Sequence, residues 1–427
     1  MTDTQRSMIT AGLVCGAAAS VVGGIAVRER VDLGALKLAS APSSVKIGSG
    51  LLASRTVETQ IPEGEYFDQM AHLLKREYVD PIKDDLKLAT GAVRGMVGSL
   101  DDVRSVFYDP KLMRSVENAR KGRYEGIGAD FVFVRAKGQA ASPGGIPMGG
   151  GGAAARSELV PRLVASWVVP GGPADRAGVK AGDWVDSVDG HWVVNTEVID
   201  RIRTASQRVQ SGEWPESKLR ELRKELREML DSAIMPYRAM ERLSLGETGQ
   251  VKVVWKRPSG VKTTVIQKSA TAARAVEETS PGVFRLRLVP GADQSLSNAA
   301  RGRKEMTLDL RGQAIGDRRD VVLCLTAIGP AGKYGQIKRE GGKPASPLQT
   351  EKGAAPPKLT ILVDGQTRGA PEALALALKA KCGAKVAGQS AGDPFLTELR
   401  SLPDGSGYRL VTGTFSPTAP AKGGKSK

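Results

Sequence analysis

The stretch between Val168 and Gly190 constrains the fold of this chain more than any other, because glycine and proline punctuate its short apolar runs. Residues 173–177 predict a short helix. Gly178 ends this helix, since glycine adopts the left-handed conformation of a helix C-cap at low steric cost. Ala181-Gly182-Asp183 then predicts a turn into an apolar strand, which closes at Asp189-Gly190. The succession of turn, helix, turn and strand indicates a small β-rich domain.

This order of motifs resembles that of a PDZ domain. Upstream, the segment Gly126-Ile127-Gly128-Ala129-Asp130-Phe131 resembles the loop with which such domains hold the terminal carboxylate of a peptide. Consecutive N–H groups exposed by glycines favour an anion, and an adjacent strand edge can pair with an extended peptide. The residues that would bind the peptide are Ile127, Gly128 and Ala129 in the carboxylate loop, and Val198 and Ile202 in a facing helix. The alternative is an ordinary hairpin and turn rich in glycine.

Length and charge exclude several classes of protein. A chain of 427 residues exceeds one ordinary core and predicts two or three domains. Lys and Arg outnumber Asp and Glu by 62 to 46, and a net charge of +16 favours anionic neighbours such as lipid headgroups or envelope polymers. Aromatic residues make up only 4% of the chain, and no basic stripe is interleaved with them, so no nucleic-acid partner is expected.

Cysteine and histidine are too few and too scattered for a zinc site or a disulfide framework. The residues concerned are Cys15, Cys324, Cys382, His72 and His191. We therefore expect no metal and no cofactor. Cys324 and Cys382 are interpreted as buried small hydrophobic residues, and a disulfide between them is the alternative in an oxidising compartment.

The N-terminus predicts a membrane anchor. No residue from Met8 to Val27 is charged, and about twenty helical residues span the hydrocarbon thickness of a bilayer. An uncleaved signal anchor over residues 1–30 is favoured over a cleaved signal peptide, because no convincing cleavage site follows the apolar run. Residues 31–62 then form a linker. Arg6 precedes the run and Arg28 follows it, so the positive-inside rule leaves the orientation open.

Residues 63–121 predict an N-terminal helical region, and residues 122–270 the PDZ-like domain. An apolar stripe at helical spacing predicts the first helix; its members are Phe67, Met70, Ala71, Leu74 and Tyr78. The PDZ-like domain carries insertions at 138–156 and about 205–240. In the second, leucines at heptad spacing predict a helix over 217–233. It either packs its leucines on the PDZ body or serves as a docking arm for a partner helix.

From residue 271 to 415, apolar strands alternate with helices, which predicts a mainly parallel or mixed sheet. The expected strands are Met306–Leu310, Leu359–Val363 and Lys385–Ala387, with a helix over Ala370–Ala380. Residues 338–357 form an excursion rich in glycine, proline and lysine, and residues 416–427 a basic tail. The fold class is therefore a multidomain α+β and α/β chain: an N-terminal helical region, a PDZ-like β-rich domain with insertions, and an α/β core.

Segments on both sides of the PDZ-like domain resemble the tail-specific, or C-terminal processing, serine peptidases. Gly95-Met96-Val97-Gly98-Ser99-Leu100-Asp101 is similar to the N-terminal helical region of that family, although Asp102-Val103-Arg104 follows where the family has Pro-His-Ser. Leu308-Asp309-Leu310-Arg311-Gly312-Gln313 is similar to the family's Asp-Leu-Arg-x-Asn-Pro-Gly-Gly segment. The resemblance implies a peptidase-like core over residues 271–415 and places the bulk of the chain in the periplasm or elsewhere outside the cytoplasm.

The resemblance also assigns the catalytic positions, and this chain departs from the family at them. Aligned on Glu372, the nucleophilic serine falls on Gly369, and the base lysine falls on Asp393. The glycine pair of the oxyanion region reads Ile315-Gly316. Glycine has no side chain with which to attack a carbonyl. The resemblance therefore implies a peptidase fold without its catalytic dyad.

Three hypotheses for the function remain. The first is a membrane-anchored, non-catalytic relative that binds protein C-terminal tails as an adaptor, inhibitor or partner of active proteases. The second is an active serine peptidase with a displaced dyad. Its nearest hydroxyls are Thr367 and Ser390, and its nearest amines are Lys379, Lys381 and Lys385. The third is a structural envelope protein with a vestigial groove.

Overall fold

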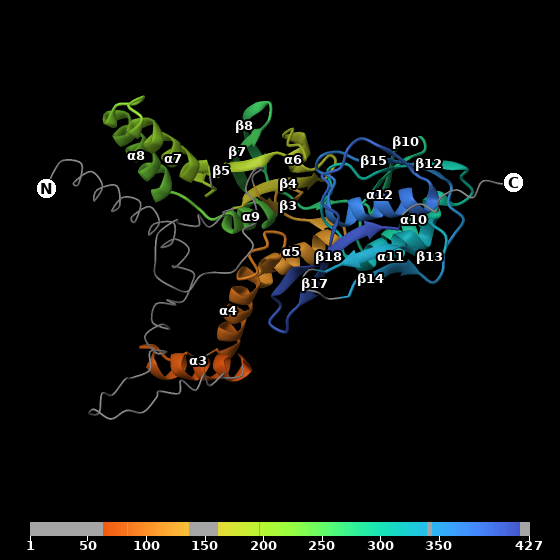
Figure 1. Ribbon diagram of the computed structural model, residues 1–427, viewed down its shortest axis with the longest axis horizontal. Coiled ribbons are helices and arrows are strands. Elements are labelled where there is room, and N and C mark those ends of the chain that lie inside the picture. Colours follow the sequence, from red (N-terminus) through yellow and green to blue (C-terminus); the bar gives the residue numbers. More distant parts are fainter. Residues whose placement is uncertain (1–62, 83, 136–160, 196, 340–343, 419–427) are drawn as a thin grey trace, which may run out of the picture. The chain divides into compact units, whose positions relative to one another are not determined.

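The computed structural model describes residues 63–418 except 83, 136–160, 196 and 340–343 (Figure 1). The chain divides into two compact units, residues 1–95 and 96–427. The described part of the first unit holds α3 (Glu63–Glu77), which confirms the helix predicted from the apolar stripe, and most of α4 (Asp85–Gly98). None of the helices in the described ranges has the length and hydropathy needed to cross a membrane, and the anchor expected at 8–27 lies outside these ranges.

The PDZ-like domain is built on an antiparallel sheet. Its strands, in spatial order, are β3 (Ala129–Val134), β4 (Arg162–Val168), β5 (Trp184–Val188), β7 (Gln250–Arg257) and β8 (Gly260–Gln267), and β6 (His191–Trp192) pairs with β5. The short helix α6 (Pro173–Arg176) ends before Gly178, whose φ of +73° confirms the left-handed C-cap expected there. Leu163, Val253 and Trp255 are fully buried at the centre of the domain.

Three helices follow β6: α7 (Glu197–Gln210), α8 (Glu216–Asp231) and α9 (Pro236–Ser244). The leucine face of α8 is buried, because Leu226 packs in a cluster with Trp192 and Val194. The inserted helix therefore packs leucines on the PDZ body, which is one of the two alternatives expected for it. Helix α7 runs from Glu197 to Gln210 without interruption, because no glycine or proline occurs in it before Gly212. It carries Val198 and Ile202, the two residues expected on the helix that faces the carboxylate loop.

The C-terminal region holds a mixed sheet, as the sequence predicts. Its strands, in spatial order, are β10 (Val276–Ser280), β11 (Val283–Leu286), β12 (Glu305–Asp309), β15 (Lys358–Leu362) and β16 (Lys385–Ala387). All neighbours are parallel except β10 and β11. The helices are α10 (Ala292–Ala300), α11 (Arg318–Ile328) and α12 (Gly369–Cys382). Helix α12 contacts β16 of this sheet and β13, β17 and β18 of a second one, so it lies between the two sheets (Figure 1).

The second sheet is antiparallel and draws on distant parts of the sequence. Its strands are β1 (Val106–Tyr108), β18 (Gly407–Pro417), β13 (Gly332–Lys338), β14 (Ser346–Thr350) and β17 (Phe395–Ser401). The expected excursion over 338–357 therefore contains a strand, β14, because alternate residues such as Leu348 and Thr350 are buried. Two short strands, β2 (Arg123–Tyr124) and β9 (Thr271–Ala272), pair with each other, and α5 (Pro110–Arg120) precedes β2.

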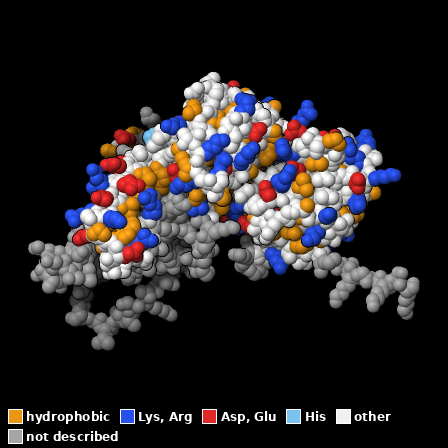
Figure 2. Space-filling model, turned by 90° about the horizontal axis from the view of Figure 1, so that it is seen from above, with side chains coloured by type: hydrophobic (Ala, Val, Ile, Leu, Met, Phe, Trp, Pro, Cys, Tyr) orange, Lys and Arg blue, Asp and Glu red, His pale blue; other side chains and the backbone are white. Residues whose placement is uncertain are grey.

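Both described cysteines are free thiols, which excludes the disulfide alternative. Cys324 is fully buried in the core, and Cys382 is half-buried. Burial raises the pKa of the Cys324 thiol, which keeps it protonated. On the face shown in Figure 2, Lys and Arg side chains are interspersed with Asp and Glu side chains rather than gathered in one stripe.

Candidate functional site

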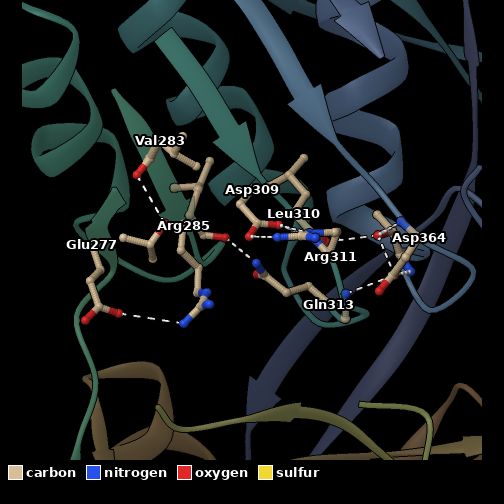
Figure 3. Close-up of polar contacts among 12 residues, drawn as sticks. Glu277, Val283, Arg285, Asp309, Leu310, Arg311, Gln313 and Asp364 are labelled. Carbon is tan, nitrogen blue, oxygen red and sulfur yellow. Dashed lines mark hydrogen bonds and ion pairs between the residues drawn. The ribbon is translucent and has the colours of Figure 1, made fainter. Parts of the chain in front are cut away.

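The candidate site lies where two parallel strands, β12 and β15, end side by side. Asp364 follows β15, and its Oδ1 accepts hydrogen bonds from the main-chain N–H groups of Gly312, Gln366 and Thr367, each at 3.0 Å. On the neighbouring strand, Asp309 pairs with Arg311 at 2.9 Å (Figure 3). The bond from Gly312 to Asp364 joins the loop after β12 to the loop after β15. The bonds from Gln366 and Thr367 to Asp364 fix the turn before α12.

Gly369 begins α12 in a conformation that few other residues adopt, with φ of +62°. Its N–H donates to the main-chain oxygen of Asp393 at 2.8 Å. A Cβ atom added at Gly369 would lie 2.9 Å from Cζ of Phe395 and 3.1 Å from the main-chain oxygen of Ala314. The ring of Phe395, which is buried, therefore fills the space that a side chain at Gly369 would need.

The structure thus brings Gly369 and Asp393 together, as the resemblance implies. The Asp393 carboxylate accepts a hydrogen bond from Nη1 of Arg104 at 3.0 Å, and its side chain is 42% exposed. Although burial opposes it, hydrogen bonding and charge from Asp102 and Asp393 raise the pKa of the Arg104 guanidinium. The same guanidinium lies 5.1 Å from the centre of the Phe395 ring. The position assigned to the base therefore holds an ion-paired carboxylate.

Gly316, in the oxyanion region, also joins this cluster. Oγ1 of Thr397 donates to the main-chain oxygen of Gly316 at 3.0 Å. A Cβ atom at Gly316 would lie 2.7 Å from Cβ of Leu288, so a close approach requires glycine here. The residue before it, Ile315, is half-buried. A β-branched side chain therefore stands directly before Gly316, where the resemblance predicts a second glycine.

The two hydroxyls considered for a displaced dyad make structural hydrogen bonds. Thr367 is fully buried, and its Oγ1 lies 3.0 Å from the main-chain oxygen of Leu310. Oγ of Ser390 donates to Oε1 of the buried Glu372 at 2.6 Å. Glu372 also accepts from the N–H groups of Gly392 and Asp393. Among the described contacts, none joins Lys379, Lys381 or Lys385 to either hydroxyl.

Three of the expected peptide-binding residues, Ile127, Gly128 and Ala129, lie at the start of β3, an edge strand of its sheet. Ile127 and Ala129 are buried. The N–H groups of Gly126, Ile127 and Gly128 donate to the main-chain oxygens of Gly246, Leu243 and Glu125, at 2.8, 3.0 and 3.3 Å. Helix α9 contacts β3, and α7, which carries Val198 and Ile202, contacts α8. The side chains of Val198 and Ile202 lie outside the described part of the chain.

A cavity of about 70 Å³ with a charged lining lies beside β3, and no sequence pattern predicts it. Arg287 and Asp130 face each other across it at 3.8 Å, and the hydroxyl of Tyr124 donates to Asp130 at 2.9 Å. Burial raises the pKa of the Asp130 carboxyl against the opposing effect of Arg287, and burial also raises that of Tyr124. Arg285 lies in β11 and Arg287 directly follows it, so no pattern marks Arg287 as the buried one of the two.

A second buried ion cluster joins α5 to the N-terminus of α11. Both Asp317 and Asp320 accept from the Arg120 guanidinium, the latter at 3.0 Å. Asp317 is also the N-cap of α11, and Asp320 accepts from the N–H of Asp317 at 3.3 Å, completing a capping box. Three charges thus hold the segment that follows Gly316.

This cluster predicts a pH dependence of stability. Burial raises the pKa of Asp320 from 3.8 to about 6, although Arg120 lowers it. The folded chain holds this proton more tightly than the unfolded chain, so the contribution of Asp320 to stability falls as the pH rises from about 4 to about 6. Asparagine at position 320 does not titrate. The free energy of unfolding of Asp320→Asn, minus that of the parent chain, is therefore expected to be up to about 3 kcal/mol larger at neutral pH than near pH 4. Urea unfolding of both proteins at a series of pH values measures this, and a pH-independent difference would contradict it.

Comparison with known proteins agrees with this arrangement. Residues 164–207 match the PDZ domain, and residues 291–420 match Peptidase family S41. The chain is 22% identical over 367 residues to the carboxy-terminal processing protease CtpA of Bacillus subtilis (strain 168), covering 85% of this chain and 67% of that protein. Its fold is similar to that of the photosystem II D1 C-terminal processing protease, with a TM-score of 0.51, 19% identity, and coverage of 82% of this chain and 87% of the other. The chain therefore carries a PDZ domain and a peptidase family S41 domain and is homologous to the C-terminal processing proteases.

Proposed function

We propose that this chain is a non-catalytic member of its family that binds the C-terminal tails of proteins. The observation that carries the proposal is Gly369. The position of the family nucleophile has no side chain, and the ring of Phe395 lies 2.9 Å from where its Cβ atom would be. Covalent catalysis requires a nucleophile within reach of a base, and neither group is available at this position.

The surroundings of Gly369 support the same proposal. Asp393 stands where the family has its lysine, and its carboxylate is engaged by Arg104 at 3.0 Å. A hydroxyl–lysine dyad gains no support from geometry, because Thr367 is fully buried and none of the described contacts joins Thr367 or Ser390 to a lysine. A nucleophilic hydroxyl needs a neighbouring base that can take up its proton, and the carboxylate beside Ser390, that of Glu372, is already engaged by the N–H groups of Gly392 and Asp393. The hydrogen bonds of both hydroxyls instead hold the turn and the loop on either side of α12.

The tail-binding part of the proposal is supported by β3, which is paired on one side only within its sheet. An extended peptide can add to such an edge through main-chain hydrogen bonds. Helix α9 packs beside the same strand and supplies the buried side chains of Met240 and Leu243. In this proposal the chain acts as an adaptor or regulator of active proteases. The uncharged run at residues 8–27 supports a membrane anchor, with the bulk of the chain outside the cytoplasm.

Fluorescence anisotropy with labelled decapeptides tests the binding. The full chain is titrated into peptides with apolar C-termini, each with a free carboxylate or a C-terminal amide. We expect saturable binding at micromolar concentrations and a preference for the free carboxylate of at least about tenfold, as the loss of one charge-assisted hydrogen bond predicts. Equal binding of acid and amide would contradict recognition of tails, and no binding at all would favour the structural envelope protein.

A further inference from the structure

The outer edge of β8 in the PDZ-like sheet has no partner strand in the described part of the chain. The strand runs over eight residues, Gly260–Gln267, and it pairs with β7 along its whole length without a bulge. In Figure 1 the β7–β8 hairpin extends to the rim of its domain. Strand β8 is therefore a long and regular edge, on the side of the sheet opposite to β3.

The main chain of β8 directs hydrogen-bonding groups away from β7. Lys252 of β7 lies opposite Val265; its N–H donates to Oδ1 of Asp189 at 2.9 Å, and its main-chain oxygen accepts from the N–H of Asp189 at 2.8 Å. Residues opposite each other in an antiparallel pair either exchange both hydrogen bonds or turn both groups outward. Val265 therefore turns its N–H and C=O outward, and Val261 and Thr263 do the same at alternate positions. Such an edge is a template for another strand.

Strand β8 lacks the features that keep sheet edges apart. Proteins protect an edge with a proline, a bulge or an outward lysine. Strand β14 contains Pro347, and β10 has a bulge that follows Glu278. The lysine of β8, Lys262, is held inside instead, because its Nζ donates to the main-chain oxygens of Ala177 at 2.8 Å and Gly178 at 3.1 Å. This lysine therefore does not repel an approaching strand.

The outward side chains of β8 identify the strand that fits it. Val261 is 66% exposed and Val265 is 59% exposed, and the exposed Thr263 lies between them on the same face. A strand that pairs here would remove both valines from water, which is favourable. The order valine, threonine, valine at alternate positions reads the same in both directions. Strand β8 is therefore complementary to a second copy of itself that runs antiparallel.

A twofold axis at Thr263 gives the best register for this pair. It places Val261 opposite Val265 of the second copy, and Lys262 opposite Thr264. A register centred on Lys262 would set the two lysines opposite each other, and like charges in that position are destabilising. A register centred on Thr264 would separate the valines. The side chains of β8 thus favour one register over its neighbours.

The charges around β8 allow the pairing, although the whole chain carries a net charge of +16. Lys252 and Lys256 of β7 lie opposite Val265 and Val261. In the joined sheet each would lie three strand spacings, about 14 Å, from the lysine in the same row of the second copy. That distance exceeds the screening length of about 8 Å at physiological ionic strength. Lys256 is also paired with Asp186 at 2.8 Å. Neither lysine therefore opposes the pairing strongly.

We propose that two copies of this chain pair through β8, antiparallel and across a twofold axis at Thr263, so that two PDZ-like sheets join into one. One strand pair buries less than the roughly 1,200 Å² of a standard interface, so the dimer is weak, with a Kd of about 10–100 µM. This inference goes beyond the proposed function and does not rest on it. Strand β3 lies at the opposite edge of each sheet and stays unpaired in the dimer.

Oxidative cross-linking of cysteine variants of the full chain tests the register. In Thr263→Cys the two new residues face each other at the axis, with Cα atoms about 5.5 Å apart, which is within reach of a disulfide. The matched control is Ser259→Cys, which is also exposed but would lie more than about 20 Å from its counterpart. We expect a disulfide-linked dimer from Thr263→Cys, and from Ser259→Cys no more than the parent chain gives. Equal yields from the two variants, whether high or absent, would overturn the register.

Sedimentation equilibrium of the full chain, from about 1 to 200 µM, measures the dimer itself. Thr263→Lys sets two like charges opposite each other at the axis and is expected to weaken the dimer about tenfold. Gln267→Lys, exposed on the same strand but outside the paired segment, should leave the dimer unchanged. Melting temperatures close to that of the parent chain show that both variants fold. A parent chain that stays monomeric, or a dimer that Thr263→Lys does not weaken, would overturn the proposal.

Discussion

Replacing Gly369 with serine is expected to lower the free energy of unfolding by about 2–4 kcal/mol and to produce no peptidase activity. Two effects add. A side chain at φ of +62° is strained, and its Cβ atom would meet the Phe395 ring at 2.9 Å, so the ring must move. Even a tolerated serine would find the Asp393 carboxylate and its ion pair with Arg104 where the family has a neutral lysine.

The matched control lies in the same turn. In Gly365→Ser the new Cβ atom has no heavy atom within 4 Å, and the φ angle of residue 365 lies outside the left-handed region. The free energy of unfolding of this variant should therefore stay within about 0.5 kcal/mol of that of the parent chain. Urea unfolding of the two variants measures the difference. Equal stability of the two would show that Phe395 does not fill the nucleophile position, and cleavage by Gly369→Ser would show that the remaining catalytic groups are intact.

Replacing Arg120 with alanine is expected to cost about 3–5 kcal/mol of unfolding free energy, because it leaves two buried carboxylates without their cation. Arg120 contacts both Asp317 and Asp320, and the Asp320 side chain is only 3% exposed. Arg114→Ala, on an exposed position of the same helix, is the control and should change stability by less than about 0.5 kcal/mol. A cost as small as that of the control would mean that the cluster does not hold the oxyanion-region segment.

The sequence predicted those elements whose apolar pattern is strong and local. The strands β12, β15 and β16 and the helix α12 lie within one or two residues of their expected bounds. Strand β14 was overlooked because glycine, proline and lysine surround it, and its burial depends on pairing with β13. The packing of α7 could not be predicted for a different reason. Its helical pattern does not show that it contacts α8.

Part of the candidate site, too, could be assigned from the sequence, and part depends on the fold. Motif order assigns Gly369, Asp393 and Gly316 by resemblance alone. In the structure Gly369 bonds to the main chain of Asp393, and Gly316 lies against Ala370, the residue after Gly369. The role of Phe395 could not be expected, since it lies 26 positions along the chain and reaches Gly369 only through the fold. Arg287 and Arg409 line one cavity although Arg287 follows β11 of the first sheet and Arg409 lies in β18 of the second, and no sequence pattern joins them.

Mass spectrometry of intact products tests the central claim, the absence of peptidase chemistry, most directly. The full chain is incubated with unfolded proteins bearing varied apolar C-termini, and an active C-terminal processing protease serves as the positive control. We predict that every substrate remains uncut while the chain stays folded. Cleavage that persists across preparations, and that disappears in Thr367→Val or Ser390→Ala, would contradict the claim and establish a displaced dyad.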